Sequence, residues 1–293
     1  MTHRFGHVAV VGRPNVGKST LVNRLVGQKV TITSRKAQTT RHAVLGIVTL
    51  PEAQIAFVDT PGYQTRFGGP LNRSLNRAVT DTLLGVDAVL FVVDAGRLGE
   101  ADRKALQLVP EGVPVVAVVN KVDLLERKEA LLPFLDQLSR ERDFAALVPI
   151  SAETGLQCDV LLEALVKTLP EGEAAYDEDQ VTDRSERFLA AEIVREKLFR
   201  LTGDELPYGA SVVVESFTTE GALRRVHCVI IVARETHKGM VIGEGGQHLK
   251  RIASEARQDM EREFDGRVFL DVRVRVDPAW MRDPRRLAKY GYG

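Results

Sequence analysis

Gly12-Arg13-Pro14-Asn15-Val16-Gly17-Lys18-Ser19 constrains this 293-residue sequence more strongly than any other segment. It matches the pattern G-x-x-x-x-G-K-[ST], continues with Thr20 and follows the apolar run His7–Val11 directly. A helical pattern begins near Gly17 and runs to Val26. A strand, a glycine-rich loop and a helix in this order are typical of a loop that wraps around phosphate groups.

Main-chain N–H groups and two side chains give this loop its expected chemistry. The glycines let N–H groups approach phosphates, and the helix that follows adds the positive end of its dipole. We expect Lys18 to place its charge on the β- and γ-phosphates and Ser19 to offer its hydroxyl to Mg²⁺. All residues from Gly12 to Thr20 are therefore candidate nucleotide-binding residues.

Apolar runs and helical patterns alternate through the first 170 residues. The further apolar runs are Ile55–Val58, Ala88–Val93, Pro114–Val119 and Leu147–Ile150. The helical patterns are Leu71–Leu84, Ala101–Val109, Lys128–Arg142 and Val160–Leu169. Buried apolar strands that alternate with helices predict an α/β fold with a doubly wound, mostly parallel sheet. The segment Thr40–Leu50 leaves no room for another helix, so we expect an edge strand paired antiparallel with the next one.

A second motif, Asp59-Thr60-Pro61-Gly62, follows the strand predicted at Ile55–Val58 and matches D-x-x-G. We expect Asp59 to act on Mg²⁺ indirectly, from behind the ligands of the ion. The N–H of Gly62 is expected to bond the γ-phosphate, which would couple the position of the loop to the presence of that phosphate.

The choice of base depends on Asn120-Lys121-Val122-Asp123, directly after the predicted strand Pro114–Val119. Guanine presents N1–H and N2–H₂ on one edge, and the carboxylate of Asp123 can accept both, whereas adenine has no matching pair of donors. A site built around such bonds rejects the analogue without them by about 10⁴- to 10⁵-fold. We expect Lys121 to lie along the base and Asn120 to tie this loop to the phosphate loop.

Ser151-Ala152, after the last of these strands, is expected to complete the base pocket through a main-chain N–H to guanine O6. The four motifs occur once each, in order, at strand ends that share one edge of the sheet, where open α/β folds bind ligands. This order is typical of the GTPase superfamily, which implies GTP or GDP with Mg²⁺ as the bound ligands.

A polar loop, Ser34–His42, lies between the first helix and the Asp59 strand. A nucleotide switch needs a threonine whose hydroxyl reaches Mg²⁺ and whose N–H reaches the γ-phosphate. Thr40 is our first candidate for this metal ligand, and Thr39 is the alternative.

Tyr63 occupies the position where many GTPases place the glutamine that orients the attacking water. A phenol is not expected to orient water in the same way, although Gln64 follows, so we expect slow intrinsic hydrolysis. Asn15 is a candidate ligand for K⁺ beside the phosphates, where the ion would act like an arginine finger. An equally weighted alternative is that Asn15 shapes the loop, because asparagine tolerates turn geometry.

The alternating pattern stops at Leu169-Pro170, and a different order of elements follows. Residues 171–180 are acidic and lack periodicity, which is typical of a linker. The helix expected at Asp183–Leu201 precedes two strands, a second helix and a third strand; these are expected at Ser211–Phe217, Val226–Ala233, Gln247–Phe264 and Val268–Val276. We therefore expect a nucleotide-binding domain over residues 1–170, a linker over 171–182, a smaller α+β domain over 183–277 and a basic tail over 278–293.

A G-x-x-G loop, Gly243-Glu244-Gly245-Gly246, precedes the long second helix of this smaller domain. Its order of elements and its loop resemble a type II KH module, whose loop clamps a single-stranded RNA backbone against main-chain N–H groups. The candidate RNA-binding residues are the loop itself and its neighbours Lys238, Ile242, Lys250 and Arg251. The alternative is a compact domain used for protein contacts.

Bulk composition limits how RNA could be held. The formal net charge is zero, so nucleic-acid binding must come from a local site and not from a strongly basic domain. The tail contains Trp280 and Tyr290 among basic residues, and it could stack on bases or pack as a C-terminal helix. The two cysteines lie far apart, which predicts neither a disulfide framework nor a zinc site. Without a signal peptide or an apolar run long enough to span a membrane, we expect a cytoplasmic protein.

Across essentially its whole length the sequence resembles the Era family, bacterial GTPases with a C-terminal KH domain. The matching strings of the first part are GRPNVGKST (12–20), ITSRKAQTTRH (32–42), DTPG (59–62), NKVD (120–123) and PISAETGL (149–156). Those of the second part are TDRSERF (182–188), EIVREKL (192–198), ELPYG (205–209) and MVIGEGG (240–246).

The resemblance implies binding to 16S ribosomal RNA near its 3′ end, with GTP controlling attachment during assembly of the small (30S) subunit. It also implies peripheral association with the cytoplasmic face of the inner membrane, for which the sequence shows no amphipathic anchor, and we expect a monomer. The alternative function is a signalling or cell-cycle GTPase whose C-terminal domain recruits proteins or membrane.

Overall fold

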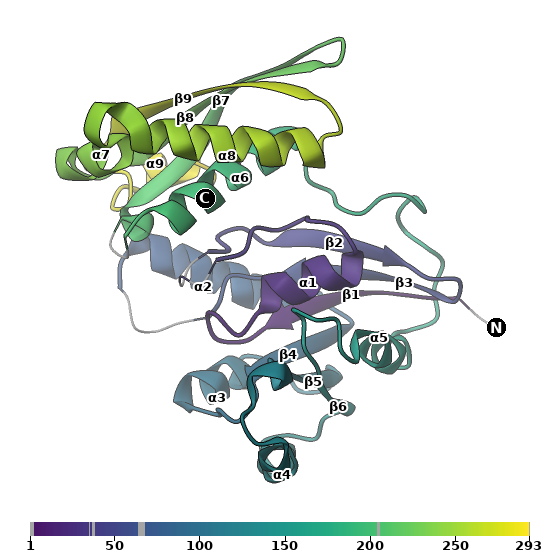
Figure 1. Ribbon diagram of the computed structural model, residues 1–293. Helices are drawn as coiled ribbons and strands as arrows, with labels where there is room; N and C mark the ends of the chain where they lie inside the picture. Colours follow the sequence, from purple (N-terminus) through teal and green to yellow (C-terminus); the bar gives the residue numbers. More distant parts are fainter. Residues whose placement is uncertain (1–2, 35, 37–38, 64–67, 204–205, 293) are drawn as a thin grey trace. The chain divides into compact units, whose positions relative to one another are not determined.

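The computed structural model describes residues 3–34, 36, 39–63, 68–203 and 206–292 (Figure 1). The chain divides into two compact units. Unit 1 comprises residues 1–31, 40–67 and 75–183, and unit 2 comprises residues 32–39, 68–74 and 184–293.

Unit 1 is built on a six-stranded sheet in the order β2-β3-β1-β4-β5-β6 (Figure 1). The strands are β1 (Arg4–Val11), β2 (Val44–Thr49), β3 (Ala53–Asp59), β4 (Ala88–Asp94), β5 (Val115–Asn120) and β6 (Ala146–Pro149). All neighbours pair in parallel except β2, which pairs antiparallel with β3 at the edge. The predicted doubly wound sheet and its antiparallel edge strand are confirmed.

Among its described residues, unit 1 also has five helices and two short 3₁₀ turns. They are α1 (Lys18–Val26), α2 (Pro70–Leu83, whose first turn belongs to unit 2), α3 (Glu100–Gln107), α4 (Leu131–Ser139), α5 (Cys158–Val166), η1 (Val122–Leu124) and η2 (Lys128–Ala130). Helices α1 and α5 cover one face of the sheet, and α2, α3 and α4 cover the other, each over its own apolar cluster. The helix predicted from Lys128 begins at Leu131, because Pro133 has no N–H to donate and fits only in a first turn.

The acidic segment after Pro170 runs along unit 1. The side-chain oxygen of Gln54 accepts from the N–H groups of Ala175 and Tyr176, both at 2.9 Å. The N–H of Ile47 in edge strand β2 donates to Val181 O at 2.9 Å. Hydrogen bonds to its main-chain groups therefore order a segment whose sequence has no periodicity.

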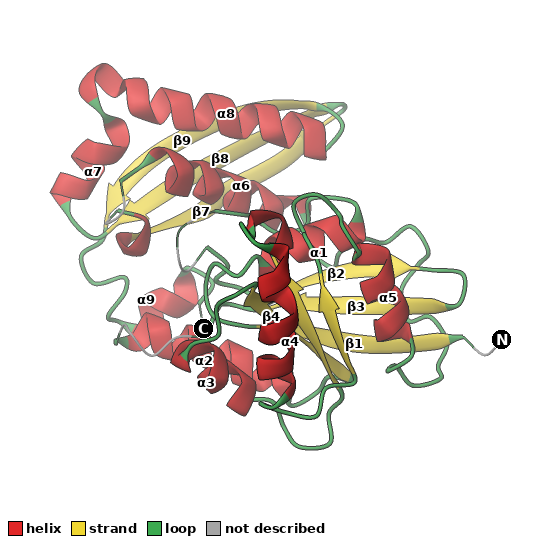
Figure 2. Ribbon diagram, turned by 60° about the horizontal axis from the view of Figure 1, so that its bottom comes forward, coloured by secondary structure: helices red, strands yellow, loops and turns green. Residues whose placement is uncertain are grey.

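Unit 2 has a three-stranded sheet in the order β7-β8-β9 (Figure 2). Strands β7 (Ala210–Glu220) and β8 (Leu223–Val232) form an antiparallel hairpin, and β9 (Arg267–Val276) pairs in parallel with β8. Helices α6 (Glu186–Leu201) and α8 (Gln247–Glu263) pack on this sheet through a shared apolar cluster. A helix that the sequence did not predict, α7 (Glu235–Ile242), lies before α8, and α9 (Pro284–Lys289) lies in the tail.

The tail packs onto unit 2. Trp280 is completely buried, and its indole N–H donates to Gly209 O at 3.2 Å. Asp277 pairs with Arg286 and accepts from the hydroxyl of Tyr290 at 2.8 Å. Of the two interpretations of the tail, packing is the one that applies to Trp280, because a buried indole cannot stack on a base.

Both cysteines, Cys158 and Cys228, are free and buried. Burial raises the pKa of the Cys228 thiol to about 12. Within the described part of the chain, no helix is both long and apolar enough to cross a membrane.

Candidate functional site

The predicted nucleotide motifs meet at one edge of the unit 1 sheet. Val11, Asp59, Asp94 and Asn120 are the last residues of four parallel strands that lie side by side in the order β3-β1-β4-β5. Since the carboxyl ends of parallel strands share an edge, the loops that follow them surround one site.

The phosphate loop needs glycine where it turns into α1. Gly17 has a φ of 95°, and a Cβ atom there would lie 2.3 Å from Asn120 Nδ2. A Cβ atom on Gly12 would lie 2.4 Å from the Val92 carbonyl oxygen. The loop therefore passes closer to the neighbouring strand ends than a side chain at either position would permit.

Lys18 lies inside this loop with 6% of its surface exposed. Its ammonium group donates to the carbonyl oxygens of Gly12 at 3.1 Å and Arg13 at 3.0 Å. Burial lowers the pKa of Lys18 to about 8. The loop thus holds a cation that is poorly solvated and well placed to be paired with an anion.

Three hydroxyl groups converge on one oxygen of the buried Asp59. Ser19 Oγ donates to Asp59 Oδ2 at 2.7 Å, Thr31 Oγ1 at 2.9 Å and Thr40 Oγ1 at 3.4 Å, while Ser19 and Thr40 are 2.7 Å apart. Thr39 instead donates to Lys36 O. Thr40 is therefore the threonine beside Ser19.

The second oxygen of Asp59, Oδ1, is buried and accepts no hydrogen bond from the described residues. Burial also raises the pKa of this carboxyl. A buried carboxylate oxygen beside two hydroxyl groups is a set of hard oxygen donors, which is the kind that Mg²⁺ prefers. Ser19, Thr40 and Asp59 thus fit the ion expected there; Thr31 was missed because no motif marks it.

The D-x-x-G loop lies against the phosphate loop. A Cβ atom on Gly62 would be 2.8 Å from the main-chain nitrogen of Pro14, and Thr60 Oγ1 donates to Val10 O at 2.8 Å. Tyr63 is half-buried against the apolar cluster shared by α2 and α3. Gln64 lies outside the described residues.

Asn120 joins the base loop to its neighbours. Its Nδ2 donates to Val16 O at 2.8 Å, and its Oδ1 accepts from Lys121 N at 2.8 Å and Ala152 N at 3.0 Å. Asp123 is exposed on η1. The carboxylate predicted to select guanine is thus open to a ligand, while the side-chain carboxamide of Asn120 holds the loop in place.

The N–H groups expected to face guanine O6 have partners inside the protein. Ser151 is completely buried, and its N–H donates to Leu156 O at 3.2 Å, while that of Ala152 donates to Asn120. Nearly all buried main-chain N–H groups in folded proteins are hydrogen-bonded in this way.

The side chain of Arg13 is held by two carboxylates. The guanidinium pairs with Asp94, and its Nε lies 3.1 Å from Asp102 Oδ1. Arg13 can therefore contribute main-chain groups to a phosphate, whereas its side-chain charge is already neutralised. Sequence reasoning missed both carboxylates, which lie outside the recognised motifs.

The G-x-x-G loop of unit 2 connects α7 to α8. Gly243 has a φ of 71°, and a Cβ atom there would lie 2.6 Å from His248 Cβ. The two ring nitrogens of His248 lie 2.9 Å from carbonyl oxygens, Nδ1 from that of Met240 and Nε2 from that of Leu201, which fixes the start of α8. Glu244 and Gly245 are exposed, so the tip of the loop can be reached.

The basic residues around the loop differ in their surroundings. Lys250 and Arg251 are exposed in the first two turns of α8, and Lys238 is half-buried in α7. Arg251 pairs with Glu255 at 2.8 Å, so part of its charge is compensated. The predicted basic residues thus lie in the helices before and after the glycine loop.

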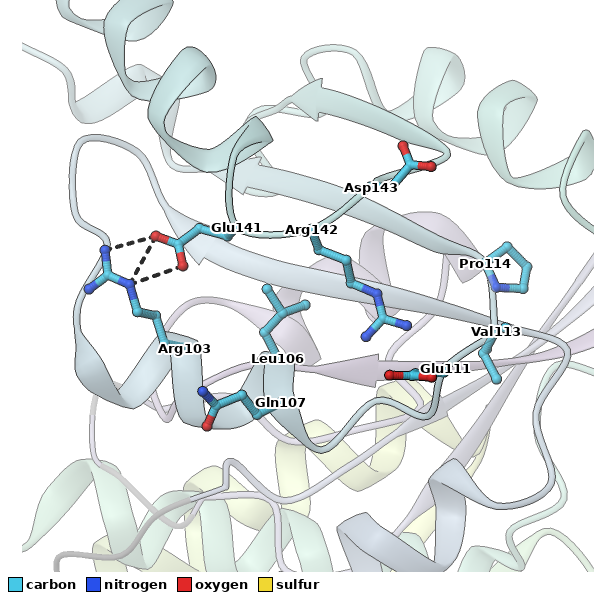
Figure 3. Close-up of a pocket in the computed structure, with 10 residues that line it drawn as sticks. Arg103, Leu106, Gln107, Glu111, Val113, Pro114, Glu141, Arg142 and Asp143 are labelled. Atoms are coloured by element: carbon cyan, nitrogen blue, oxygen red, sulfur yellow. Dashed lines mark hydrogen bonds and ion pairs between the residues drawn. The ribbon is translucent and has the colours of Figure 1, made fainter.

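A pocket of about 550 Å³ lies at the opposite ends of β5 and β6 (Figure 3). Arg103 donates to both oxygens of Glu141 at 2.9 and 3.0 Å. Arg142 donates to the carbonyl oxygens of Val109 and Pro110. These groups hold chain segments together away from the nucleotide motifs, so we give this pocket no part in nucleotide binding.

Two family matches cover different parts of the chain. The family described as 50S ribosome-binding GTPase matches residues 7–121, and the KH domain family matches residues 205–281. The chain is 49% identical over 290 residues to GTPase Era of Nitrosomonas eutropha, covering 99% of this chain and 98% of that protein. It is 52% identical over 286 residues to GTPase Era of Chromobacterium violaceum, covering 98% and 97%.

Two solved structures are similar over 99% of both chains, each with a TM-score of 0.95. One is the Y63A variant of Era from Aquifex aeolicus bound to GDP and AlF₄⁻, at 40% identity. The other is Era in complex with MgGDPNP and nucleotides 1506–1542 of 16S ribosomal RNA, at 39% identity. Identity near 50% over full length, together with the strand-end motifs and the KH loop, leaves no ambiguity of family. The chain belongs to the Era family of GTPases.

Proposed function

We propose that this chain binds and hydrolyses GTP to control its attachment to 16S ribosomal RNA near the 3′ end, in assembly of the small (30S) ribosomal subunit. The observation that carries the nucleotide part is the convergence of Ser19, Thr31 and Thr40 on Asp59 beside the buried Lys18. The solved relatives with a GTP analogue and with 16S RNA support both parts.

The site stabilises the charge that develops on the transferred phosphoryl group. When bound, Mg²⁺ would neutralise charge on the β- and γ-phosphates. Ser19 and Thr40 would hold the ion, and Asp59 would orient their hydroxyl groups from behind. Lys18 would replace its two carbonyl acceptors by phosphate oxygens, a stronger pairing for a buried ammonium.

Hydrolysis is expected to be slow without help. Tyr63 packs on an apolar cluster and offers no carboxamide to orient water. A K⁺ ion held by Asn15 is one source of help. Asn15 also has a φ of 68°, which supports the alternative that this residue shapes the loop.

The G-x-x-G loop is the proposed RNA clamp. Its exposed tip and the open start of α8, where no side chain caps the first N–H groups, suit a phosphate backbone. Lys250 and Arg251 add local charge in a chain whose net charge is zero. Glu244 would point away from the phosphates.

The loop between Thr31 and Thr40 supports a link between nucleotide and RNA. Thr31 and Thr40 donate to Asp59 in unit 1, whereas residues 32–39 belong to unit 2. There, the N–H of Thr33 donates to Glu196 at 3.2 Å, and Arg200 donates to the Thr33 hydroxyl at 3.1 Å. A nucleotide that reorders Thr40 would therefore act on a segment bound to α6.

The test is to crosslink the GTP-bound chain to cellular RNA and to read the bound sequence. We expect the 3′ end of 16S RNA. Replacing both Glu244 and Gly245 by Asp should abolish this crosslink and spare GTP hydrolysis. Unchanged RNA crosslinking in that variant would favour a signalling GTPase whose C-terminal domain recruits other partners. The monomeric state, the cytoplasmic location and the peripheral membrane association stay predictions.

A further inference from the structure

Asp94, the last residue of β4, holds two cations that belong to two different loops. One carboxylate oxygen pairs with Arg13 of the phosphate loop, and the other lies 2.8 Å from the ammonium of Lys121 in the base loop. The three side chains are 18%, 14% and 34% exposed, so water screens these pairs only in part. Asp94 is thus a bridge between the two loops that contact the two ends of a nucleotide.

The strand end itself is fixed. The N–H of Ala95, the next residue, donates to Asn120 O at 2.8 Å. Asp94 therefore starts from a backbone position tied to β5, which gives its carboxylate little freedom to follow either cation.

A second carboxylate, that of Asp102, also lies against the guanidinium of Arg13. Asp102 is 1% exposed, its Oδ1 lies 3.1 Å from Arg13 Nε, and its Oδ2 accepts from Gly99 N at 2.9 Å at the start of α3. The guanidinium is therefore paired with two carboxylates.

Both partners of Asp94 act on the phosphate loop. The carbonyl oxygen of Arg13 accepts from Lys18, and the ammonium of Lys121 donates to Asn15 O at 2.6 Å. The position of the loop from residue 13 to residue 15 thus depends on contacts that lead back to Asp94. Without this carboxylate, two partly buried cations would face each other without their shared anion.

We infer that Asp94 is a positioning residue for guanine-nucleotide binding, which locks the phosphate loop and the base loop into one register. It acts through Arg13 and Lys121 and touches no nucleotide itself. The inference rests on nucleotide binding at this site, and it adds a residue that none of the four motifs contains.

The test is Asp94→Asn, which keeps the size of the side chain and removes its charge. Release of a fluorescent GDP analogue should become about tenfold faster or more, as expected when one member of a partly buried charged pair is removed. The loss should fall on KM for GTP, with a much smaller change in kcat. A role in folding alone would lower the active fraction, and hence apparent kcat, without changing KM or the release rate.

Glu141→Gln is the matched control. Glu141 pairs with Arg103 in the same way, with distances of 2.8 to 3.0 Å, at the opposite end of the strands. The GDP release rate and the KM of this variant should equal those of the native chain.

A double variant tests the bridge. Combining Lys121→Met with Asp94→Asn should accelerate GDP release by less than the product of the two single effects, because both substitutions break the same contact.

Asp102→Asn keeps the inference testable if Asp94→Asn folds poorly. It weakens the hold on Arg13 alone and should accelerate GDP release by a smaller factor than Asp94→Asn would, with a normal melting temperature. If the native chain retains GDP and Asp94→Asn releases it at the native rate, the inference alone is overturned. If Asp94→Asn does not fold, release at the native rate by Asp102→Asn overturns it in the same way. A native chain that retains no GDP would overturn the proposed nucleotide site and this inference together.

Discussion

The carboxamide nitrogen of Asn120 donates to the main-chain oxygen of Val16 across 2.8 Å, which ties the base loop to the phosphate loop at a buried position. In Asn120→Asp an oxygen would replace this donor, while the acceptor for Lys121 and Ala152 is kept. Leaving a buried carbonyl without its donor costs about 1–3 kcal/mol. We expect GDP affinity to fall by about 5- to 150-fold, measured by equilibrium titration.

The control for that exchange is Asp136→Asn on the surface of α4. Asp136 is 64% exposed and pairs with an exposed arginine, so its loss should leave GDP affinity unchanged. Equal affinities for Asn120→Asp and the native chain would show that the contact with Val16 does not serve binding.

Nucleotide binding should take up a proton near pH 8. The pKa of Lys18 is about 8 in the folded chain against 10.5 for an ordinary lysine, because burial disfavours the ammonium. A bound phosphate stabilises the ammonium, so GDP affinity should fall as the pH rises through about 8, below the range in which guanine N1 titrates. Calorimetric titrations in two buffers of different ionisation heat should show proton uptake at about pH 8.5 and none at about pH 6.5.

The same pKa shift should make the nucleotide-free fold more stable as the pH rises, whereas it makes GDP binding weaker. Between about pH 8 and pH 10.5 the unfolded chain binds more protons at Lys18 than the folded chain does. The contribution of Lys18 to the free energy of unfolding therefore rises with pH across that window.

For the calorimetric experiment, the contradicting outcome is an absence of proton uptake at about pH 8.5. It would mean that Lys18 is already fully protonated before GDP binds.

Removing Mg²⁺ should accelerate GDP release, and this effect should depend on Asp59. Its buried Oδ1 and the hydroxyl groups around Oδ2 form the oxygen-rich part of the site. We expect a chelator to accelerate GDP release from the native chain strongly, by about tenfold or more, since the ion offsets phosphate charge. Asp59→Asn should release GDP quickly with or without the chelator, and a full chelator effect in that variant would contradict the assignment.

Selection of guanine should depend on the charge of Asp123. In Asp123→Asn one acceptor becomes a donor, which suits the C2 carbonyl of xanthine and repels the amino group of guanine. We expect preference to shift from GDP to xanthosine diphosphate by about 10²-fold or more, because unmatched polar groups are costly. Competition between the two nucleotides measures this shift, and an unchanged ratio would remove Asp123 from the base site.

Local motifs predicted the sheet edge, because each one joins a strand end to a loop within a few residues. Helix α7 could not be predicted in the same way. Its sequence ETHKGMVI contains Gly239 and three β-branched residues, and of its side chains only that of Val241 is buried. Packing against α8 and β9, more than helix propensity, accounts for this helix.

Other features depended on residues far apart in the sequence. Arg13 looks like a phosphate ligand from its place in the motif, but its partners lie 81 and 89 positions later. Thr31 joins Asp59 across 28 positions, and Trp280 reaches Gly209 across 71. Pairing of this kind follows from the fold, and no periodicity or spacing in the sequence encodes it.

Asn15 allows the two readings of its role to be separated. Its φ of 68° lies in the left-handed region, which glycine adopts without strain and alanine does not. Asn15→Gly therefore keeps the loop geometry and removes the carboxamide, whereas Asn15→Ala removes the carboxamide and strains the loop. If Asn15 binds K⁺, the native chain should hydrolyse GTP faster in potassium than in sodium salts, and both variants should lose this difference. If Asn15 only shapes the loop, Asn15→Gly should behave as the native chain does in both salts, and only Asn15→Ala should lose activity. Equal native rates in the two salts would exclude the K⁺ role, because a cation that substitutes for an arginine finger must act through its size.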